Sequence, residues 1–484
     1  MTVKDALAKR CAAAGFTDVT AGTDLSGGAV VVVKKGGARS LKAGGAWIYD
    51  NEIDHIEGDA DGGEIVCVKD FDGYDLGYGC INPASKIRVR MLARYTKEGI
   101  TPSFLRLRVR DAWESRRAVM GADSDCCRVI FGEADFLPGI TVDRFGDVLV
   151  IESLALGTDR LKDLILLDLV EILEEDGIVI RGIYERSDAK VRQLEGLERV
   201  RGFIGPEFDT LVPIVENSIR YSVDVKDGQK TGFFLDQKYN RRAVADLVRN
   251  LKMSRACAVA ARDDRSEDSQ PAGGVSGDSQ SAGELPGESQ SVGGLQEDCL
   301  LTRERTDGVT VLDCFTHTGS FGLNAAAAGA SYVLSVDASR SAIEMAKKNA
   351  AANGLDSVIE YCVEDVFELL PKLEQGEKFD VVILDPPAFT KSRQATKNAV
   401  KGYREINLRG MKLVKNGGFL ATCSCSHFMD EPLFRKTLSE AARGARRRLR
   451  QVSFSTQAPD HPILWGEDES YYLKFFIFQV LEER

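Results

Sequence analysis

The sequence predicts an α/β protein: a C-terminal, doubly wound parallel sheet preceded by a small β-barrel domain and a mixed α/β middle domain. Two features predict the sheet, namely short apolar runs that each end in an acidic residue and helical segments that separate one run from the next. A third feature is a glycine-containing turn between the first run and its helix. The 484 residues suffice for two to four domains with ample core.

The first strand of the predicted sheet covers 309–314 and is followed by a turn and a helix. The turn contains Phe315, Thr316 and Gly319, and the helix is expected over 320–330. Because glycine has no Cβ, Gly319 lets the backbone of the turn approach a bound ligand. One side of a ligand site is therefore expected at this turn.

The second strand, 331–336, ends at Asp337, and Ser339 or Ser341 can cap the helix that follows. In this arrangement the acid after the second strand accepts hydrogen bonds from ribose hydroxyl groups. A dinucleotide site would need a glycine where this chain has His317, which weakens a pyrophosphate interpretation. An adenosyl cofactor without phosphate, S-adenosylmethionine (SAM), needs no such glycine, and the pattern favours it.

A third acid, Asp365, follows the predicted strand 359–363 and precedes a helix that runs towards Leu373. In the same architecture this position faces the adenine ring of the cofactor, where a carboxylate can accept from the exocyclic amine. The other interpretation is that Asp365 caps the helix after it. The two interpretations are compatible.

The strand 379–384 ends in Asp385, Pro386 and Pro387, and Phe389 follows. Prolines fix the backbone dihedral and donate no hydrogen bond, so their carbonyl groups and the Asp385 carboxylate are free to face a ligand. A polar strand end with an aromatic residue beside it can hold a flat ring. We therefore predict substrate-binding roles for Pro386, Pro387 and Phe389 and a role in both pockets for Asp385.

A further apolar strand begins at Gly418 and ends in a run that contains Cys423 and Cys425. The carboxyl ends of parallel strands meet at one edge of a sheet, so we expect Asp385 and Cys425 to be neighbours. A thiolate that adds to C6 of a pyrimidine makes C5 nucleophilic enough to take a methyl group. This chemistry predicts Cys425 as the nucleophile, Asp385 as the group that binds the ring N3 or amino group, and Cys423 as a rival thiol. An inert buried cysteine is the alternative.

At these residues the chain resembles the class I SAM-dependent methyltransferases and, more narrowly, the PUA-domain-containing large-subunit rRNA methyltransferases that make 5-methylcytosine. Further stretches that resemble this family are Lys230–Gln237, Gly132–Arg144, Tyr184–Asp188, Arg39–Lys42 and Trp47–Tyr49. The resemblance implies a Rossmann-like sheet, SAM as cofactor, ribosomal RNA as partner and Cys425 as nucleophile. It also implies that the cofactor and base pockets are lined by Asp313, Asp337, Asp365 and Asp385.

The chain departs from that family at two places. Gly45 and Ala46 stand before Trp47 where the family often has His-Pro, and His427 follows the cysteine motif where a small residue is usual. These departures concern the details of RNA binding and leave the expected fold unchanged.

The expected domains are an N-terminal extension, a PUA-like barrel, a mixed α/β domain and a methyltransferase domain, at 1–27, 28–97, 98–205 and 206–484. An acidic segment, 259–306, interrupts the last of them. It contains an imperfect ten-residue repeat that begins at Asp268, Asp278 and Glu288, and it has few large apolar residues. Such a segment cannot offset its ordering entropy, so we predict a disordered insertion.

The net charge of −11 is concentrated in that insertion, because 263–299 carries −8 and leaves about −3 for the rest of the chain. The acidic balance therefore does not argue against an RNA partner. Basic clusters that could contact phosphates stand at Lys86–Arg90, Arg106–Arg110, Arg241–Arg242 and Arg443–Arg450.

The eleven cysteines are scattered without metal-binding spacing, and four unpaired histidines argue against a His-rich metal centre, so we expect no metal. Neither a signal-like segment nor an apolar run of membrane-spanning length is present, which predicts a cytoplasmic protein without a membrane partner. The sequence leaves open whether the chain forms a homodimer.

These features predict a SAM-dependent methyltransferase that forms 5-methylcytosine in large-subunit (23S) rRNA through a covalent adduct between Cys425 and C6. One alternative is methylation of an exocyclic amine, N6 of adenine or N2 of guanine, which needs no thiol. Another is a non-catalytic RNA-binding assembly factor that keeps the methyltransferase fold. Replacing Cys425 with Ala separates the two chemistries, and titration with SAM tests the assembly factor.

Overall fold

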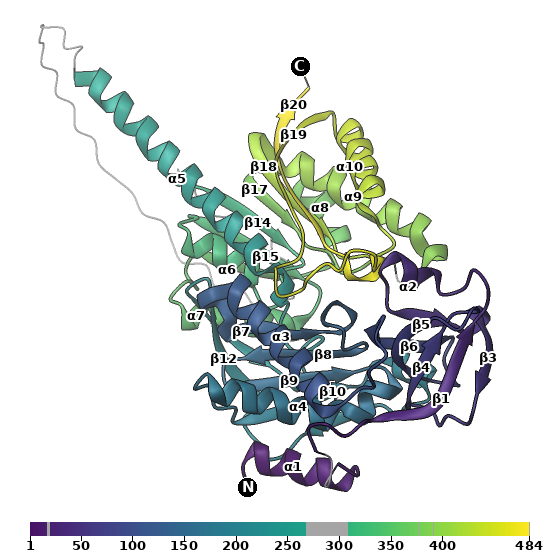
Figure 1. Cartoon of the computed structure of the whole chain (residues 1–484). Helices are drawn as coiled ribbons and strands as arrows, with labels where there is room; N and C mark the ends of the chain where they lie inside the picture. Colours follow the sequence, from purple (N-terminus) through teal and green to yellow (C-terminus); the bar gives the residue numbers. More distant parts are fainter. Residues whose placement is uncertain (17–19, 268–307, 377, 391, 484) are drawn as a thin grey trace, which may run out of the picture.

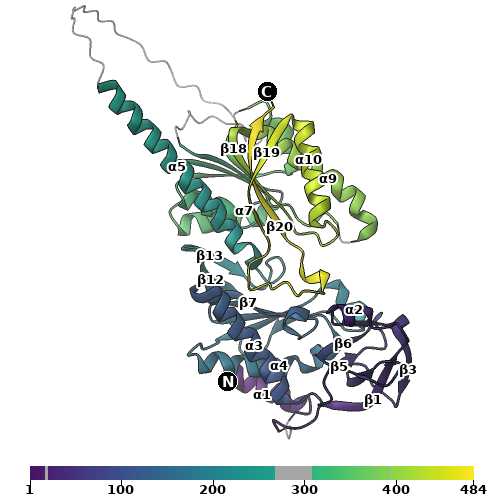
Figure 2. The same cartoon turned by 45° about the horizontal axis from the view of Figure 1, so that its top comes forward.

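The computed structural model describes residues 1–16, 20–267, 308–376, 378–390 and 392–483. Figure 1 shows three sheet-containing parts: an N-terminal sheet in purple, a middle domain in blue beside it, and a C-terminal sheet in green and yellow above both. The turned view in Figure 2 shows the same order of parts. Most of the predicted acidic insertion lies outside the described residues.

The N-terminal part is a six-stranded mixed sheet, in agreement with the predicted small β domain. Its elements are β1 (Ser26–Val33), α2 (Arg39–Ala43), β2 (Trp47–Tyr49), β3 (Ile53–Glu57), β4 (Ile65–Lys69), β5 (Asp75–Ile81) and β6 (Ile87–Arg94). The strand order is β2-β6-β5-β4-β1-β3, and only the β1–β4 pair is parallel. Aliphatic side chains such as Val31, Val66 and Val89 form its own core.

The middle domain packs helices against a five-stranded sheet. Its elements are α3 (Pro102–Met120), β7 (Cys126–Phe131), β8 (Ile140–Phe145), β9 (Val148–Ser153), α4 (Leu156–Glu175), β10 (Gly182–Ser187) and β11 (Val200–Phe203). The N-terminal extension forms α1 (Val3–Ala13), which docks on α4 by burying Leu7 and by an ion pair from Arg10 to Asp163. The strand predicted at 178–184 corresponds to β10, which begins four residues later, at Gly182.

The C-terminal part is a seven-stranded sheet with the order β16-β15-β14-β17-β18-β20-β19. Its strands are β14 (Thr310–Cys314), β15 (Tyr332–Asp337), β16 (Ile359–Val363), β17 (Phe379–Leu384), β18 (Val414–Ser424), β19 (Arg447–Ser455) and β20 (Lys474–Glu482). The pairs among β14 to β18 are parallel, and β20 is antiparallel to both neighbours. The strand order reverses between β14 and β17, which is where open α/β sheets bind ligands.

The helices of this part are α6 (Ser320–Ala327), α7 (Arg340–Ala352), α8 (Val366–Leu373), α9 (Thr396–Leu413) and α10 (Glu431–Ala445). Apolar side chains of α9 and α10 pack on one face of the sheet, and those of α6 and of the preceding helix α5 (Lys238–Glu267) pack on the other. Helix α9 begins seven residues before the predicted start at Tyr403. Its first turn is polar and has no apolar periodicity, so the sequence pattern does not indicate where the helix begins.

Two elements lead into this sheet. The hairpin of β12 (Leu211–Glu216) and β13 (Ile219–Asp224) is fastened to α7, where the Asn349 Oδ1 accepts from the Ser222 N–H at 2.9 Å. Helix α5 was expected to end near Met253 and the insertion to start at 259, but the helix continues to Glu267. The run after Ser254 is rich in alanine, the strongest helix former, which explains the longer helix.

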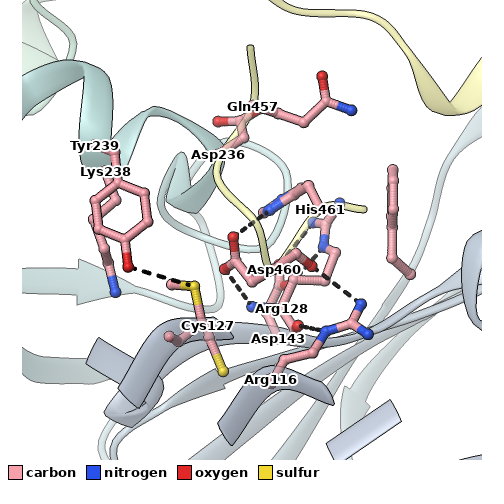
Figure 3. Close-up of polar contacts among 12 residues, drawn as sticks. Arg116, Cys127, Arg128, Asp143, Asp236, Lys238, Tyr239, Gln457, Asp460 and His461 are labelled. Atoms are coloured by element: carbon pink, nitrogen blue, oxygen red, sulfur yellow. Dashed lines mark hydrogen bonds and ion pairs between the residues drawn. The ribbon is translucent and has the colours of Figure 1, made fainter. Parts of the chain in front are cut away.

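Buried polar contacts join the middle domain to the loop between β19 and β20 (Figure 3). The Asp460 carboxylate accepts from the Arg128 backbone N–H at 2.9 Å, and the Asp460 carbonyl accepts from the Arg116 guanidinium at 3.1 Å. The Arg128 side chain pairs with Asp143 at 2.7 Å, and the His461 Nδ1 lies 2.9 Å from the Asp460 Oδ1. The C-terminal sheet is thereby fixed to the domain beneath it.

None of the described helices is both long and apolar enough to cross a membrane. Within the described ranges, no group of three or more His, Cys, Asp or Glu side chains is arranged to hold a metal ion. The cysteines in these ranges form no disulfide bonds.

Candidate active site

A cavity of about 340 Å³ lies at the carboxyl ends of the parallel strands. The predicted site residues that line it are Phe315, Thr316, Asp337, Asp365, Asp385, Pro386, Pro387, Phe389 and Cys425. The opposite wall comes from a segment that precedes the sheet in sequence, through Gln229, Lys230, Phe234, Asp236, Gln237 and Arg241. Asp313 and Gly319 are not among the lining residues.

Asp385 directly follows β17, and one of its oxygens is held by two donors. The Oδ1 atom accepts from the Gln237 Nε2 at 3.0 Å and from the Cys423 Sγ at 2.8 Å. Burial raises the pKa of Asp385 to about 6, and the hydrogen bonds from Cys423 and Gln237 work against that rise. This carboxyl group can therefore take up or release a proton close to neutral pH.

The two neighbouring cysteines have different surroundings. Cys423 lies in β18, is 0% exposed, and directs its thiol to Asp385. Cys425 follows that strand, lines the cavity, and places its Sγ 3.8 Å from the Pro386 carbonyl oxygen. Burial raises the pKa of the Cys425 thiol to about 11, and the positive charge of Lys230 opposes that rise. Of the two thiols, Cys425 is therefore the one within reach of a ligand in this cavity.

Asp313 ends up beneath the turn after β14, although the resemblance implied that it lines a pocket. Its Oδ2 accepts from the Thr316 hydroxyl at 2.5 Å and from the Gly322 N–H at 2.8 Å, because the chain folds back over it. Its Oδ1 is buried without a hydrogen-bond partner in the described residues, and burial raises the pKa of Asp313 to about 7. Asp313 thus stabilises the turn through hydrogen bonds from beneath it and does not line the cavity.

The backbone of the turn between β14 and α6 depends on Gly319, the residue predicted to allow a close approach there. Gly319 has a φ of +86°, and a Cβ at this position would lie 3.0 Å from the Ala346 Cβ on α7. Phe315 and His317 also have positive φ values, of 64° and 50°. The turn is therefore tightly wound and held close to α7.

Asp337 and Asp365 line the cavity from the ends of β15 and β16. The two oxygens of Asp337 accept from the backbone N–H groups of His317 and Ser339, at 2.9 and 2.8 Å. Each oxygen has a second lone pair, so both can still accept from a ligand. Asp365 caps α8 by accepting from the Phe367 N–H at 2.7 Å, which confirms the predicted cap and leaves its other oxygen for the cavity.

The aromatic end of the cavity packs against Tyr403 on α9. The Phe389 ring lies 4.6 Å from the Tyr403 ring and 5.7 Å from the Phe367 ring, measured between centroids. Pro386 is buried and Pro387 is exposed, so the two prolines present one inner and one outer surface. Together with Asp385 they form a rim that is polar on one side and aromatic on the other.

The segment before α5 and the first turn of that helix contribute groups whose places in the cavity the sequence did not predict. The Lys230 ammonium lies 4.8 Å from the Phe234 ring centroid, at the edge of the cavity. Arg241, a predicted phosphate contact, is instead buried in an ion pair with Glu216 at 2.7 Å. The family signature Lys230–Gln237 marked this segment, but no local pattern indicates that Gln237 reaches Asp385, 148 positions later.

Lys474 is a buried residue near Cys425 for which the sequence predicted no role. Lys474 at the start of β20 is 1% exposed, and its Nζ donates to the carbonyl groups of Ser426 and Tyr472, each at 2.8 Å. Burial lowers the pKa of Lys474 to about 8. This side chain fixes the backbone just after Cys425.

Two family models match the chain: a PUA-like domain over residues 31–94 and Conserved hypothetical protein 95 over residues 300–418. Relatives named ribosomal RNA large subunit methyltransferase I are similar over nearly the whole length. The protein from Shewanella denitrificans is 35% identical, and one from Escherichia coli is 33% identical, each over 93% of this chain and 99% of its own.

Solved structures are also similar to this chain. One, from Streptococcus mutans and assigned as a SAM-dependent methyltransferase, has a TM-score of 0.67 at 18% identity and covers 93% of this chain and 99% of its own. Another, assigned as a methyltransferase and complexed with SAH, has a TM-score of 0.68 at 18% identity with the same coverage. At this identity the likeness shows a common fold.

Proposed function

The chain belongs to the ribosomal RNA large subunit methyltransferase I family, and we propose that it uses SAM to methylate C5 of a cytosine in large-subunit rRNA. The family supports the methyl donor and the rRNA substrate. The observation that supports C5 chemistry is that the Cys425 thiol and the Asp385 carboxyl group line one cavity, at the ends of two adjacent strands. A thiol in that place has no use in the methylation of an amine.

The lining of the cavity fits SAM. Asp337 has free lone pairs for ribose hydroxyl groups, and Asp365 has a free oxygen for the adenine amine. Phe367 adds an aromatic surface beside Asp365. The bound cofactor supplies a methyl group on a positively charged sulfur, and the acidic lining favours that charge.

Cys425 would act as the nucleophile. Its thiolate forms a bond to C6, and the electron pair of the C5=C6 double bond makes C5 nucleophilic. C5 then takes the methyl group. Water that enters the cavity takes up the C5 proton, and the electron pair of that C–H bond restores the double bond. The C6–S bond breaks in the same step and returns the Cys425 thiolate, which is a good leaving group.

Asp385 would stabilise the base as it is attacked. Addition at C6 places negative charge on the ring at N3, and a carboxyl group with a pKa of about 6 can supply a hydrogen bond or a proton there. Phe389 and Pro387 offer surfaces against which a base taken out of its stack can rest. The PUA-like sheet would bind the surrounding RNA.

Nucleoside mass spectrometry tests this proposal. Unmodified large-subunit rRNA is incubated with the enzyme and SAM carrying a labelled methyl group, and we expect the label in 5-methylcytidine. Cys425→Ala should give none. Label in a methylated amine that persists in Cys425→Ala would support the amino-group chemistry, and a lack of SAM binding in calorimetry would support the assembly factor.

A further inference from the structure

A series of hydrogen bonds runs from Ser455, the last residue of β19, to Asp385. The Ser455 hydroxyl donates to the Asn240 Oδ1 at 2.7 Å, and the Asn240 Nδ2 donates to the Gln237 Oε1 at 2.6 Å. The Gln237 Nε2 donates in turn to the Asp385 Oδ1 at 3.0 Å and lies 3.4 Å from the Cys423 Sγ. Asn240 is 2% and Gln237 3% exposed, so water does not compete for these bonds.

The donor and acceptor of every hydrogen bond in this series are fixed at the Asn240 end. The Asn240 Nδ2 also lies 3.3 Å from the Thr456 carbonyl oxygen, which can only accept. The amide of Asn240 must therefore turn its nitrogen to that carbonyl and to the Gln237 Oε1. The amide of Gln237 is then forced to turn its nitrogen, a donor, towards Asp385.

We propose that Gln237 is a positioning residue for the methyl transfer: by donating to Oδ1, it directs the Oδ2 of Asp385, and any proton that the carboxyl group carries, to the base. This inference rests on the proposed function, in which Asp385 contacts the base. Oδ1 receives two donors, so it has to act as an acceptor. Oδ2 has no hydrogen-bond partner in the described part of the chain, and Asp385 lines the cavity.

The charge balance around Asp385 agrees with this role. Burial raises the pKa of Asp385 to about 6 and the nearby Asp236 adds to the rise, whereas Cys423, Arg241 and Gln237 oppose it. Asp313 on β14 and Cys425 after β18 also interact electrostatically with Asp385. The amide of Gln237 is uncharged, so replacing it with Leu changes the orientation of the Asp385 carboxyl group without removing a charge.

Two variants test the proposal. Gln237→Leu keeps the approximate volume and removes the amide, and we expect kcat/KM for rRNA methylation to fall about 10²-fold, the effect of a misplaced catalytic group. The dissociation constant for SAM should stay within about twofold, because Gln237 does not belong to the adenosyl end of the cavity. The exposed Gln451→Leu on β19 serves as the matched control and should leave both quantities unchanged.

Gln237→Glu supplies a pH-dependent readout that a purely structural role would not give. Its ionised carboxylate repels Asp385, but its protonated form can donate to the Asp385 Oδ1 as the amide does. We therefore expect its kcat/KM, relative to the wild type, to recover at least about tenfold as the pH falls from about 8 to about 5, towards the ordinary range for Glu. This comparison needs only Gln237→Glu and the wild type, so it decides the question even if Gln237→Leu fails to fold.

The proposal is overturned if Gln237→Leu folds and keeps wild-type kcat/KM, or if Gln237→Glu shows no relative recovery at low pH. Loss of SAM affinity in parallel with activity would also overturn it, because Gln237 would then serve the cofactor site or the fold. Failure of the proposed function is recognised separately, since the wild-type enzyme would then label a nucleoside other than 5-methylcytidine.

Discussion

At the scale of single residues, Cys425 takes part of its reactivity from a charge that comes from outside the sheet. The Lys230 ammonium opposes the burial that raises the pKa of Cys425 to about 11. Removing that charge should raise the pKa of Cys425 further, so that less thiolate is present at any pH below it.

We therefore predict that Lys230→Met slows alkylation of Cys425 by iodoacetamide several-fold at about pH 8.5, the ordinary thiol pKa. The reaction is followed on the peptide that contains Cys425, because Cys257 is exposed and reacts as well. Lys226→Met, an exposed lysine in the same loop, is the control and should leave the rate unchanged. Equal rates in all three proteins would contradict the assignment.

Asp313 allows a second prediction at this scale. Its pKa is about 7 in the folded protein and near 3.8 when exposed, so the folded state holds a proton between these values that the unfolded chain has released. The free energy of unfolding should therefore fall as the pH rises from about 4 to about 7. Denaturant unfolding of Asp313→Asn across that window should show a weaker dependence on pH than the wild type, and parallel curves would contradict the prediction.

The sequence reading succeeded for the residues that end strands and failed where side chains turn inward. Asp385 and Cys425 were expected to be neighbours because both follow parallel strands, and this placement is confirmed. Asp313 also ends a strand, but the donors from Thr316 and Gly322 draw it under the turn. Cys423, the supposed rival, is a partner of Asp385. The directions in which the Asp313 and Cys423 side chains point depend on the three-dimensional structure and leave no pattern in the sequence.

At the scale of elements, the turn from β14 to α6 sets the shape of the cofactor side of the cavity. Gly319→Ala would place a side chain at a φ of +86° and 3.0 Å from Ala346. We expect the free energy of unfolding to fall by about 1–2 kcal/mol from backbone strain. Displacement of the turn should also weaken SAM binding about tenfold, which corresponds to about 1.4 kcal/mol.

Gly354→Ala is the matched control for this prediction. Gly354 also has a positive φ, of 67°, but a Cβ there would meet nothing within 4 Å. Calorimetry should therefore show reduced stability in both variants and reduced SAM affinity only in Gly319→Ala. A normal SAM affinity in Gly319→Ala would mean that the turn does not shape the cofactor site.

Element boundaries were predicted well where apolar periodicity is strong and less well where it is weak. The caps at Ser339 and Asp365 begin their helices as expected, because a side-chain acceptor stands just before each apolar stretch. The polar first turns of α9 and the alanine-rich end of α5 carry no such signal, and both helices are longer than expected.

At the scale of the whole molecule, the buried polar interface of Figure 3 holds the methyltransferase sheet on the middle domain. Arg116 pairs with Asp135 at 2.5 Å and donates to the Asp460 carbonyl. Arg116→Met would leave Asp135 buried and unpaired, so we expect the free energy of unfolding to fall by about 3–5 kcal/mol.

The neighbouring residue on α3 provides the comparison. Arg117 is 53% exposed and pairs with Asp176 at the surface, so Arg117→Met should cost at most about 1 kcal/mol. Denaturant unfolding of the two variants measures the difference. Equal effects would show that the buried contacts of Arg116 stabilise the fold no more than a surface ion pair does.

The basic clusters predicted to contact phosphates have surroundings that the sequence did not reveal. Of the basic residues proposed to contact phosphates, Arg90 pairs with Glu133 and Glu195, and Arg106 and Arg110 share Glu175. Basic residues that cluster in the sequence are therefore partly used inside the protein. Charge counting cannot detect this, because the acidic partners lie up to 105 positions away.

The central claim is that Cys425 attacks the cytosine that Asp385 holds. A cytosine with fluorine at C5 tests this directly, because the fluorine cannot leave as a proton does and the C6–S bond should persist. We predict that large-subunit rRNA containing 5-fluorocytidine, incubated with enzyme and SAM, becomes covalently bound and that peptide mass spectrometry locates the bond at Cys425. An adduct at Cys423, or methylation of rRNA with no adduct under these conditions, would contradict the account.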